Sequence, residues 1–411
     1  MTMTDDSRFI LDPATSDLHA DNDRLRRAGP LVPVTAEGVP VWAATRYATL
    51  LAVLTHPDMS RDIRFWDAAA RAAAPSGTAI DRIVTDTSML NAEGEEHRRL
   101  RQPLTAAFSP RRLKALRPRI EQLTAELIDR LAGFPPDQPV DMRKEFAYPL
   151  PRDVISYMIG IPDAHQERLH ELTDAVAQVG GGPDDSPELR HDLHVLLGQI
   201  IEERRGTPGE DLITDLIALR ERDGGRLSND ELFATIELLF IAGHVTTVNL
   251  ITNAIGALVN APDQVKLLAS GECPFSAAVE ETLRWDSPIA YFPMRYARRD
   301  VEVDGVALRT GEPVLACFAS AGRDPDQYGE NAHVYDLTRQ PVNHLSFGHG
   351  PHFCLGAPLA RLEAEVALSA LFAAFPQIAP AAAPEELAPL NTLLGNSTRT
   401  MPVLLGPRAG R

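Results

Sequence analysis

Cysteine is scarce in this 411-residue chain, and its pattern excludes two kinds of structural framework. Cys273, Cys317 and Cys354 are the three present, and no two of them form a CxxC pair. Neither a disulfide framework nor a zinc ribbon fits this pattern. Basic residues are also outnumbered, with 40 Lys and Arg against 57 Asp and Glu. The formal net charge of −17 argues against nucleic acid as the main partner, because phosphate binding needs a basic surface.

The sequence shows no clear signal for export or for a membrane span. The first residues, "MTMTDDSRFI", are acidic and lack an apolar core, so we predict no signal peptide. The most apolar long stretch, 236–259, contains Glu237, His244, Asn249 and Asn253, which make it too polar for a span. We therefore expect a soluble cytoplasmic protein with no membrane partner.

Helical periodicity dominates the chain after about residue 95, whereas strand patterns are few. Helices are predicted where apolar residues recur with a period of about 3.6, at 94–108, 111–133, 191–205 and 357–376. Strands are predicted for 32–46, as a hairpin around Glu37-Gly38, and for 295–319, as a small sheet with an Asp-Gly turn. Glycine and proline predict a loop at 179–188. These patterns indicate a mainly α protein with a minor β region, one domain over 1–411, and short flexible ends at about 1–8 and 406–411.

The longest predicted helix begins after Ser228. Ser228 and Glu231 form a capping box, and Pro262 follows the expected end near Asn260. At about 1.5 Å per residue, such a helix is about 48 Å long and crosses a domain of this size. We therefore expect it to be a central helix.

Cys354 lies in "LSFGHGPHFCLG" (345–356), directly before a predicted helix. Pro358 suits the first turn of that helix, where the N–H group that proline lacks would be unpaired. The dipole and free N–H groups at a helix start favour a thiolate over a thiol. A buried structural cysteine is the commonest alternative, and a nucleophilic thiolate is another, although no His–Asp pattern supports it.

The residues around Cys354 favour a planar partner. Gly348, Gly350 and Gly356 allow tight turns and close approach, and Phe347 supplies an aromatic wall. A thiolate with room for a large flat group fits an axial ligand of haem iron. The complete pattern F-G-x-G-x-H-x-C-x-G favours this interpretation over the two alternatives.

This pattern, residues 347–356, resembles the haem-binding signature of the cytochrome P450 family, the haem-thiolate monooxygenases. The resemblance to soluble bacterial members of actinobacterial type covers about residues 10–405. It implies the family's triangular, mostly helical prism with a long central helix. It also implies haem b as the cofactor, with Cys354 as the iron ligand and Phe347, Gly348 and Gly356 beside the porphyrin.

Glu281 and Arg284 are three residues apart on a predicted helix. Such pairs are usually weak ion pairs at the surface. About 70 residues before the cysteine, however, the pair resembles the buried pair that braces the haem-binding core of the family. Val334 stands where the family often has a third, arginine partner, and the identity of that partner stays open.

His97 and Arg101 are four residues apart on one face of a predicted helix. They either form a solvated basic face or donate hydrogen bonds to haem propionates, a charge-assisted contact. The resemblance favours the second interpretation. By their positions, Arg295 and His352 resemble the other propionate contacts.

The segment "IAGHVTTVNL" (241–250) resembles the oxygen-binding segment of the family. Ala242 and Gly243 would leave space over the haem, and Thr246, followed by Thr247, can bond back to a carbonyl group one turn earlier. We expect the resulting distortion to open a notch for a ligand, a Gly–Thr packing kink being the alternative.

Val245 departs from the family pattern, which usually has Asp or Glu at this place. Valine cannot carry a proton. Three explanations stay open: water that enters by another route, with His244 assisting; a polar group of the substrate; or turnover with peroxide. Thr246 could still relay protons through ordered water.

The segments that contact substrate in the family map onto 87–91, 177–188, 239–246, 289–292 and 391–394. Their content is apolar and offers no charged anchor, which suits a medium-sized hydrophobic molecule. The candidate contacts, some of which could instead pack the core, are Met89, Leu239, Ile289, Tyr291, Phe292, Leu393 and Leu394.

The resemblance implies hydroxylation of a secondary metabolite, such as a macrolide or other polyketide, or of a steroid, with O2. Electrons would come from a ferredoxin and its NAD(P)H-dependent reductase, since the chain has no flavin or nicotinamide module. The ferredoxin would dock near Cys354, with Arg98, Arg111, Arg112 and Arg361 as candidate contacts. The alternatives are oxidative coupling of phenols or indoles, a non-catalytic binding module with this fold, and a cysteine hydrolase.

Overall fold

The structure is a computed structural model of the 411-residue chain. It describes residues 8–15, 17–178, 187–222, 227–340 and 342–410. Its helices are α1 (Leu18–Ala28), α2 (Tyr47–Thr55), α3 (Ala68–Ala73), α4 (Ala79–Thr85), α5 (Gly94–Ala107), α6 (Pro110–Leu131), α7 (Pro149–Ile159), α8 (Asp163–Gln178), α9 (Pro187–Gly206), α10 (Leu212–Arg222), α11 (Asn229–Val259), α12 (Pro262–Ser270), α13 (Phe275–Trp285), α14 (Phe318–Ala321), α15 (Pro325–Tyr328) and α16 (Ala357–Ala374). Its strands are β1 (Phe9–Leu11), β2 (Leu31–Ala36), β3 (Val39–Ala44), β4 (Met59–Ser60), β5 (Pro139–Asp141), β6 (Tyr291–Ala297), β7 (Val301–Val303), β8 (Val306–Leu308), β9 (Pro313–Cys317), β10 (Ala379–Pro380) and β11 (Pro402–Leu404).

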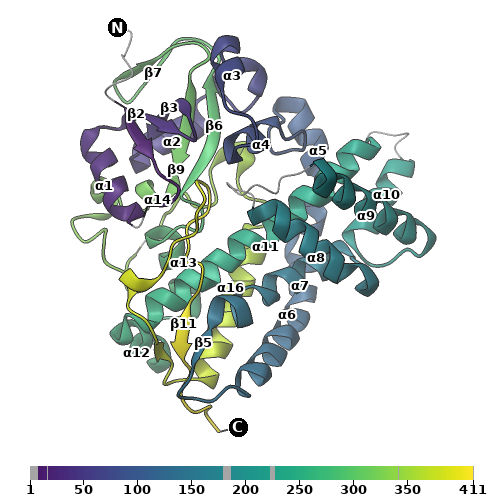
Figure 1. Cartoon of the computed structure of the whole chain (residues 1–411), viewed down its shortest axis with the longest axis vertical. Helices are drawn as coiled ribbons and strands as arrows, with labels where there is room; N and C mark the ends of the chain where they lie inside the picture. The colour runs from purple at the N-terminus through teal and green to yellow at the C-terminus, as the bar shows by residue number, and fades with distance from the viewer. Residues whose placement is uncertain (1–7, 16, 179–186, 223–226, 341, 411) are drawn as a thin grey trace.

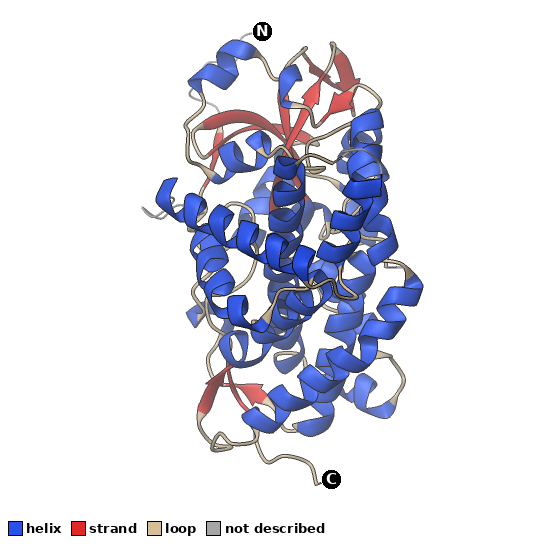
Figure 2. Cartoon of the chain, turned by 90° about the vertical axis from the view of Figure 1, so that its right-hand side faces the viewer, coloured by secondary structure: helices blue, strands red, loops and turns tan. Residues whose placement is uncertain are grey.

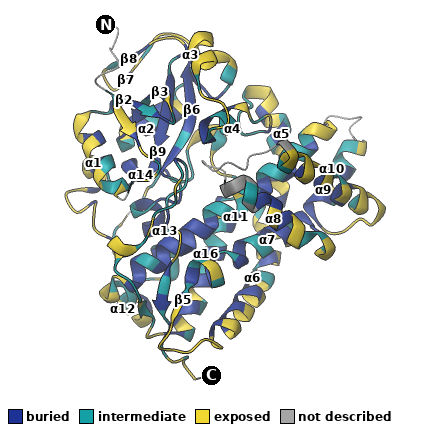
Figure 3. Cartoon of the chain, in the orientation of Figure 1, coloured by how far each residue is buried: buried dark blue, intermediate teal, exposed yellow. Residues whose placement is uncertain are grey.

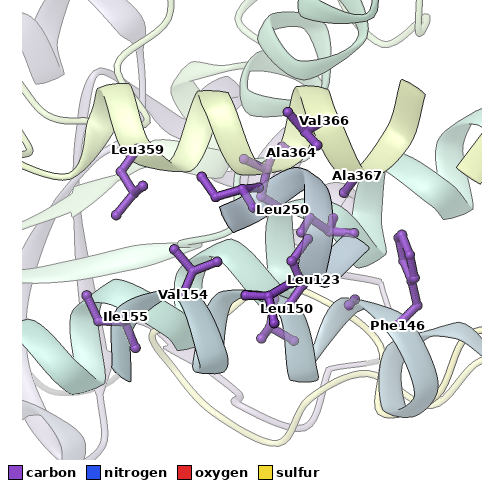
Figure 4. Packing of buried hydrophobic residues seen from close by; sticks show 14 of the residues in the cluster. Leu123, Phe146, Leu150, Val154, Ile155, Leu250, Leu359, Ala364, Val366 and Ala367 are labelled. Atoms are coloured by element: carbon purple, nitrogen blue, oxygen red, sulfur yellow. The ribbon is translucent and has the colours of Figure 1, made fainter. Parts of the chain in front are cut away.

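Helices form the main body, and α11 runs through its middle (Figure 1). It packs against α7, α13 and α16, and α16 in turn packs against α6. The interior faces of these helices carry aliphatic side chains, including Leu250 of α11, Val154 and Ile155 of α7, and Leu359 of α16 (Figure 4). The exposed faces belong mostly to outer helices such as α6, α9 and α10 (Figure 3). This packing fixes α11 and α16 relative to each other.

The capping box at the start of α11 is formed as predicted. The Ser228 hydroxyl accepts the N–H of Glu231 at 3.1 Å, and the Glu231 carboxylate accepts the N–H of Ser228 at 2.7 Å. The helix ends at Val259, and Pro262 begins α12. Within the described residues, α11 is the one helix long and apolar enough to cross a membrane, but its position is that of a core helix.

The largest sheet lies at one end of the molecule, and a three-stranded sheet lies near the C-terminus (Figure 2). The order in the large sheet is β1-β2-β3-β9-β6-β4, and β10, β11 and β5 form the other. The β2–β3 hairpin turns at Glu37 and Gly38, whose φ angles are 47° and 81°. Strands β7 and β8 pair around Asp304-Gly305, the predicted Asp-Gly turn. Both predicted β segments are therefore confirmed.

The two predicted β segments belong to one sheet, which their local patterns did not indicate. Strand β9 pairs in parallel with β3 and antiparallel with β6. Pairing between strands about 270 residues apart leaves no local signal in the chain. The loop expected at 179–188 falls mainly on residues 179–186, which lie outside the described part, as does most of the expected flexible start.

The described end of the chain, where a flexible tail is predicted, makes two backbone hydrogen bonds to earlier segments. The Gly406 N–H donates to the Pro136 carbonyl, and the Ala409 N–H donates to the Ala374 carbonyl. These bonds hold residues 406–410 against the helical body.

Candidate active site

The loop before α16 presents Cys354 to a cavity under α11. The Cys354 N–H donates to the Phe347 carbonyl at 2.8 Å and closes the loop. Gly348 and Gly350 have φ angles of 70° and 74°, in the left-handed region that favours glycine. Gly356 has a φ of −79°, and a Cβ there would lie 3.9 Å from the cysteine sulfur. Two of the three glycines are thus required by the turn, whereas Gly356 keeps an ordinary helical conformation.

The start of α16 and nearby cations act on the Cys354 thiol. The thiol faces the cavity but is closely surrounded by protein, and this burial raises its pKa. The N–H groups of Gly356 and Ala357 and the charges of Arg101 and Arg361 act in the opposite direction. The predicted preference of the helix start for a thiolate is thus present, but without a further cation burial outweighs it.

A half-buried carboxylate, that of Glu280, holds the cysteine loop to α13. Glu280 accepts two hydrogen bonds from Arg361, at 2.6 and 3.0 Å, and contacts His344 at 3.1 Å. The Arg361 guanidinium also stacks over the Phe347 ring at 4.5 Å. Burial opposes ionisation of Glu280, but the contacts with His344 and Arg361 outweigh it and lower its pKa to about 2. Ionised Glu280 therefore holds both ends of the loop.

Glu281 and Arg284 form a fully buried, bidentate pair with distances of 2.6 and 2.8 Å. Arg284 uses its remaining donors on three carbonyl groups, those of Gly322, Ala332 and Val334, at 2.7–3.0 Å. A Cβ at Gly322 would lie 1.9 Å from the Arg284 carbonyl oxygen, so the close approach requires glycine. The pair is therefore a bracing element of the interior and not a surface ion pair.

The third partner that the sequence left open is Arg339. Its Nε lies 3.4 Å from Glu281 Oε1, and the N–H of Asp336 donates to the same oxygen at 2.9 Å. Val334 contributes only its backbone carbonyl, and its side chain is exposed. An arginine five residues further along the chain thus takes the place that an arginine at 334 would have.

The four residues expected to bind propionates meet at one edge of the cavity. His97, Arg101, Arg295 and His352 all line it, and the rings of His97 and His352 are 4.3 Å apart. Burial lowers the pKa of both histidines, and the neighbouring arginines lower it further. Burial also lowers the pKa of Arg295 to about 10, despite Glu93 at 3.8 Å.

Arg61 belongs to the same edge, although the sequence did not single it out. It directly follows β4, is 8% exposed and lines the cavity beside Arg295. Its charge lowers the pKa of both His97 and His352. Among the described residues that line the cavity, none is Asp or Glu. This edge thus gathers positive charge on the cavity surface, and the nearby Glu93 carboxylate is not among the described lining residues.

Helix α11 forms the opposite wall. Ala242, Gly243, Thr246 and Thr247 line the cavity, and the Thr246 hydroxyl donates to the Ala242 carbonyl at 2.9 Å, as predicted. Helix α11 runs without interruption from Asn229 to Val259, and the notch stays a prediction. A Cβ on Gly243 would lie 2.7 Å from Ile155 Cδ1, which shows that this glycine allows close packing of α7.

The two neighbours of the threonines do not supply a proton donor to the cavity. Val245 is half-buried and is not among the lining residues. His244 is 1% exposed, contacts the Phe240 carbonyl through Nδ1 at 2.9 Å, and packs edge-on against Tyr148. The suggested assistance of His244 is therefore not supported, because its ring faces the core.

Apolar side chains complete the cavity, and they include four of the seven expected substrate contacts. Met89, Leu239, Ile289 and Phe292 line it. The structure does not bring the other three there. Tyr291 is 4% exposed and donates to Asn22 Oδ1 at 2.8 Å, Leu393 packs in the same core cluster, and Leu394 binds the Ala290 N–H through its carbonyl.

The donors fit a haem group. The two propionate carboxylates of haem would neutralise the cationic edge. Its iron would stabilise the Cys354 thiolate. The apolar side chains between these two features suit the porphyrin ring. Phe347, Gly348 and Gly356 also line the cavity, where the ring would lie.

The arginines expected at a ferredoxin-docking face differ in availability. Arg98 is exposed and pairs with Glu95 on its own helix, and Arg111 is exposed at the start of α6. Arg112 binds Asp215 at 2.7 Å, and Arg361 is held by Glu280. Arg361 therefore stabilises the cysteine loop, and Arg98 and Arg111 are more available than Arg112 or Arg361 for contact with a partner.

Comparisons with known proteins agree on one family. The family model described as Cytochrome P450 matches residues 275–399. A vitamin D(3) 25-hydroxylase from Pseudonocardia autotrophica is 39% identical, over 94% of this chain and 93% of that protein. A 6-deoxyerythronolide B hydroxylase from Saccharopolyspora erythraea is 35% identical, over 86% and 87% respectively. The solved structure of CYP154C4 from Streptomyces sp. W2061 aligns with a TM-score of 0.93 at 39% identity and covers 100% of both chains.

Proposed function

Because this chain belongs to the cytochrome P450 family of haem-dependent monooxygenases, we propose that it hydroxylates a medium-sized apolar molecule of steroid or polyketide type. The observation that carries the proposal is the apolar cavity that separates Cys354 from the α11 threonines. Two relatives are named as a vitamin D(3) 25-hydroxylase and a 6-deoxyerythronolide B hydroxylase, and these names support hydroxylation as the reaction. The reaction would take place in the cytoplasm.

The roles of the residues follow from their places around the cavity. When bound, haem supplies the activation of molecular oxygen by which the family hydroxylates. Cys354 would ligate its iron, and His97, Arg101, Arg295 and His352 would bind its propionates through charge-assisted hydrogen bonds. The Glu280–Arg361 contact would keep the cysteine loop in place.

Substrate would lie between Phe292 and the side of α11 that faces the cavity. Met89, Leu239, Ile289 and Phe292 supply apolar contact area, so orientation would depend on shape more than on hydrogen bonds. Ala242 has no side chain beyond Cβ, which leaves space for the substrate next to Thr246.

Protons would reach the site through hydroxyl groups and water. Thr246 and Thr247 are the hydroxyl groups of the α11 wall, and no described lining residue is an acid. The Thr246 hydroxyl donates to Ala242 and therefore keeps its lone pairs free to accept from water. We expect proton delivery to depend on how well a bound substrate orders that water.

A ferredoxin and its NAD(P)H-dependent reductase would supply electrons. Phe353 precedes the cysteine and is 41% exposed, which offers an apolar contact close to Cys354. Arg98 and Arg111 are exposed cations that would complement an acidic partner.

The test is a spectral titration of the purified haem protein with steroids, macrolides, indoles and aromatic cyclic peptides, followed by turnover with a surrogate ferredoxin and reductase. The proposal predicts a low-to-high-spin shift and a product one oxygen atom heavier for a steroid or macrolide. A product that has lost two hydrogen atoms and joined two rings would instead establish oxidative coupling. Binding of indoles or peptides alone would contradict the proposed substrate class.

A further inference from the structure

The start of the Arg61 side chain is held rigidly beside the cavity. The Arg61 N–H donates to Glu93 Oε1 at 2.7 Å, and the Ser60 hydroxyl donates to Oε2 of the same carboxylate at 2.7 Å. Arg298 also binds this carboxylate, so Glu93 is already occupied. Glu93 thus fixes the backbone from which Arg61 extends but is not a dedicated partner of its guanidinium.

The Arg61 guanidinium itself is poorly satisfied. Its Nε is buried and has no hydrogen-bond partner among the described residues. Its Nη2 lies 3.4 Å from both Asn91 Oδ1 and the Pro293 carbonyl, longer than the usual 2.7–3.2 Å or so for such bonds. The group stacks over the Phe292 ring at 5.0 Å. A buried, charged guanidinium with unused donors is costly unless a ligand binds it.

The surroundings of Arg61 select the kind of ligand. Burial and the charge of Arg295 lower its pKa to about 9, so it stays charged at neutral pH. It lies between the cationic edge at Arg295 and His352 and the apolar wall at Phe292. A planar carboxylate matches a planar guanidinium through two parallel hydrogen bonds.

We propose that Arg61 is a carboxylate-binding residue of this cavity, in addition to the four expected propionate contacts. The carboxylate has two possible sources. It is either a haem propionate or an acid group on an apolar substrate that packs against Phe292. This inference rests on the proposed function for the identity of the cavity, and it adds a cationic anchor for an acid group, which the sequence did not indicate.

The experiment uses the holoenzyme with Arg61→Gln and Arg61→Lys. Arg64→Gln is the matched control, because Arg64 lies three residues away, is exposed and pairs with Asp62. Haem release is followed by transfer to excess apomyoglobin. Affinity is measured by spectral titration with 1-naphthoic acid and with its methyl ester, which differ in the carboxylate.

The two sources predict different results. If Arg61 binds a propionate, Arg61→Gln releases haem about ten-fold faster or more, the size expected for a charge-assisted hydrogen bond, and Lys restores part of the loss. If Arg61 binds a substrate acid, haem release is unchanged, and the variant loses about ten-fold in affinity for the acid but not for the ester.

Two results would overturn the proposal, and both require that Arg61→Gln releases haem at the wild-type rate. In the first, the variant keeps the wild-type preference for the acid over the ester. In the second, the wild type itself binds acid and ester equally well. If Arg61→Gln does not fold, Arg61→Met replaces it in the same measurements. Failure of the proposed function is distinguishable, because it would appear as a wild type that binds no haem or oxidises no steroid or macrolide.

Discussion

Two buried groups of charged side chains in this protein are neutralised in different ways. Glu281 and Arg284 satisfy each other, and every remaining donor of Arg284 meets a backbone carbonyl. Arg61 and Arg295 are almost as deeply buried, yet among the described residues Arg61 Nε has no hydrogen-bond partner and the nearest acid to Arg295 is 3.8 Å away. The first group is complete within the chain, and the second is the one to which we assign an anion from outside.

The difference separates the part of the interior that holds the fold from the part that holds a ligand. Removing one member of a complete buried pair leaves the other charge uncompensated, which is strongly destabilising. Removing one arginine from a set of neighbouring like charges need not destabilise the haem-free protein, because the charges repel each other. Mutations in the two groups should therefore have opposite signatures.

The largest effect is expected for Glu281→Gln. The variant leaves Arg284 charged and buried, which costs about 3–5 kcal/mol of the free energy of unfolding. Urea denaturation followed by circular dichroism measures this loss. Glu272→Gln, at an exposed acid near α13, is the control and should be close to neutral. A Glu281→Gln variant as stable as the wild type would contradict the bracing role of the Glu281–Arg284 pair.

Arg295→Gln should separate stability from cofactor retention. With the like charges of Arg61 and Arg295 no longer together, the haem-free protein should unfold at the same urea concentration as the wild type or higher. The holoenzyme should instead release haem about ten-fold faster, because one charge-assisted hydrogen bond is lost. Equal destabilisation of both forms would show that Arg295 supports the fold and not the ligand.

Low pH should loosen the cysteine loop through Glu280. The pKa of this carboxyl is lowered from 4.5 to about 2 in the folded protein. Its stabilising contribution is therefore fully present above about pH 4.5 and is lost as the pH falls towards 2. Glu280→Gln should remove this part of the acid sensitivity in a series of urea denaturations. An identical pH profile for the two proteins would contradict the role of the carboxylate.

Val245→Glu tests proton delivery at the α11 wall of the cavity, whose described residues carry no charge. An acid beside Thr246 should raise the fraction of reductant that appears as product, because it supplies a proton donor that the described α11 wall of the cavity lacks. The ratio of product to NAD(P)H consumed is the readout, and Val245→Gln is the uncharged control. The effect should be modest, since Thr246 is already present, and no change in the ratio would sink the idea.

The smallest effect is expected at the docking face. Arg98→Glu and Arg111→Glu should slow reduction by ferredoxin, and more so at low salt, where charge interactions are screened less. Stopped-flow reduction at several salt concentrations measures this. Arg64→Glu, at an exposed arginine that is not among the candidate contacts, is the control. A rate that does not depend on salt in any variant would argue for another docking face.

Local pattern was sufficient for much of the fold. The capping box placed the start of α11, and the apolar period placed α5, α6, α9 and α16 to within a few residues. The pattern around Cys354 predicted the loop, and the back-bond of Thr246 was also predicted. These features depend on neighbours within a few residues, which a single sequence displays directly.

The remaining features depend on contacts between distant segments. Arg61 lies in a stretch without a recognisable motif, and Arg339 is offset by five residues from the expected position. Tyr291 and Phe292 were assigned to the cavity together, but successive residues of a strand point to opposite faces. Only Phe292 faces the cavity, and that alternation could have been used in advance.

The central claim is that Cys354 supplies a thiolate to haem in this cavity. The most direct measurement is the absorption spectrum of the reduced carbon monoxide complex of the purified protein, with Cys354→Ser for comparison. The account predicts a Soret band of the thiolate type in the wild type and its loss in the variant. Protein without haem, or a band of the imidazole type that Cys354→Ser leaves unchanged, would contradict it.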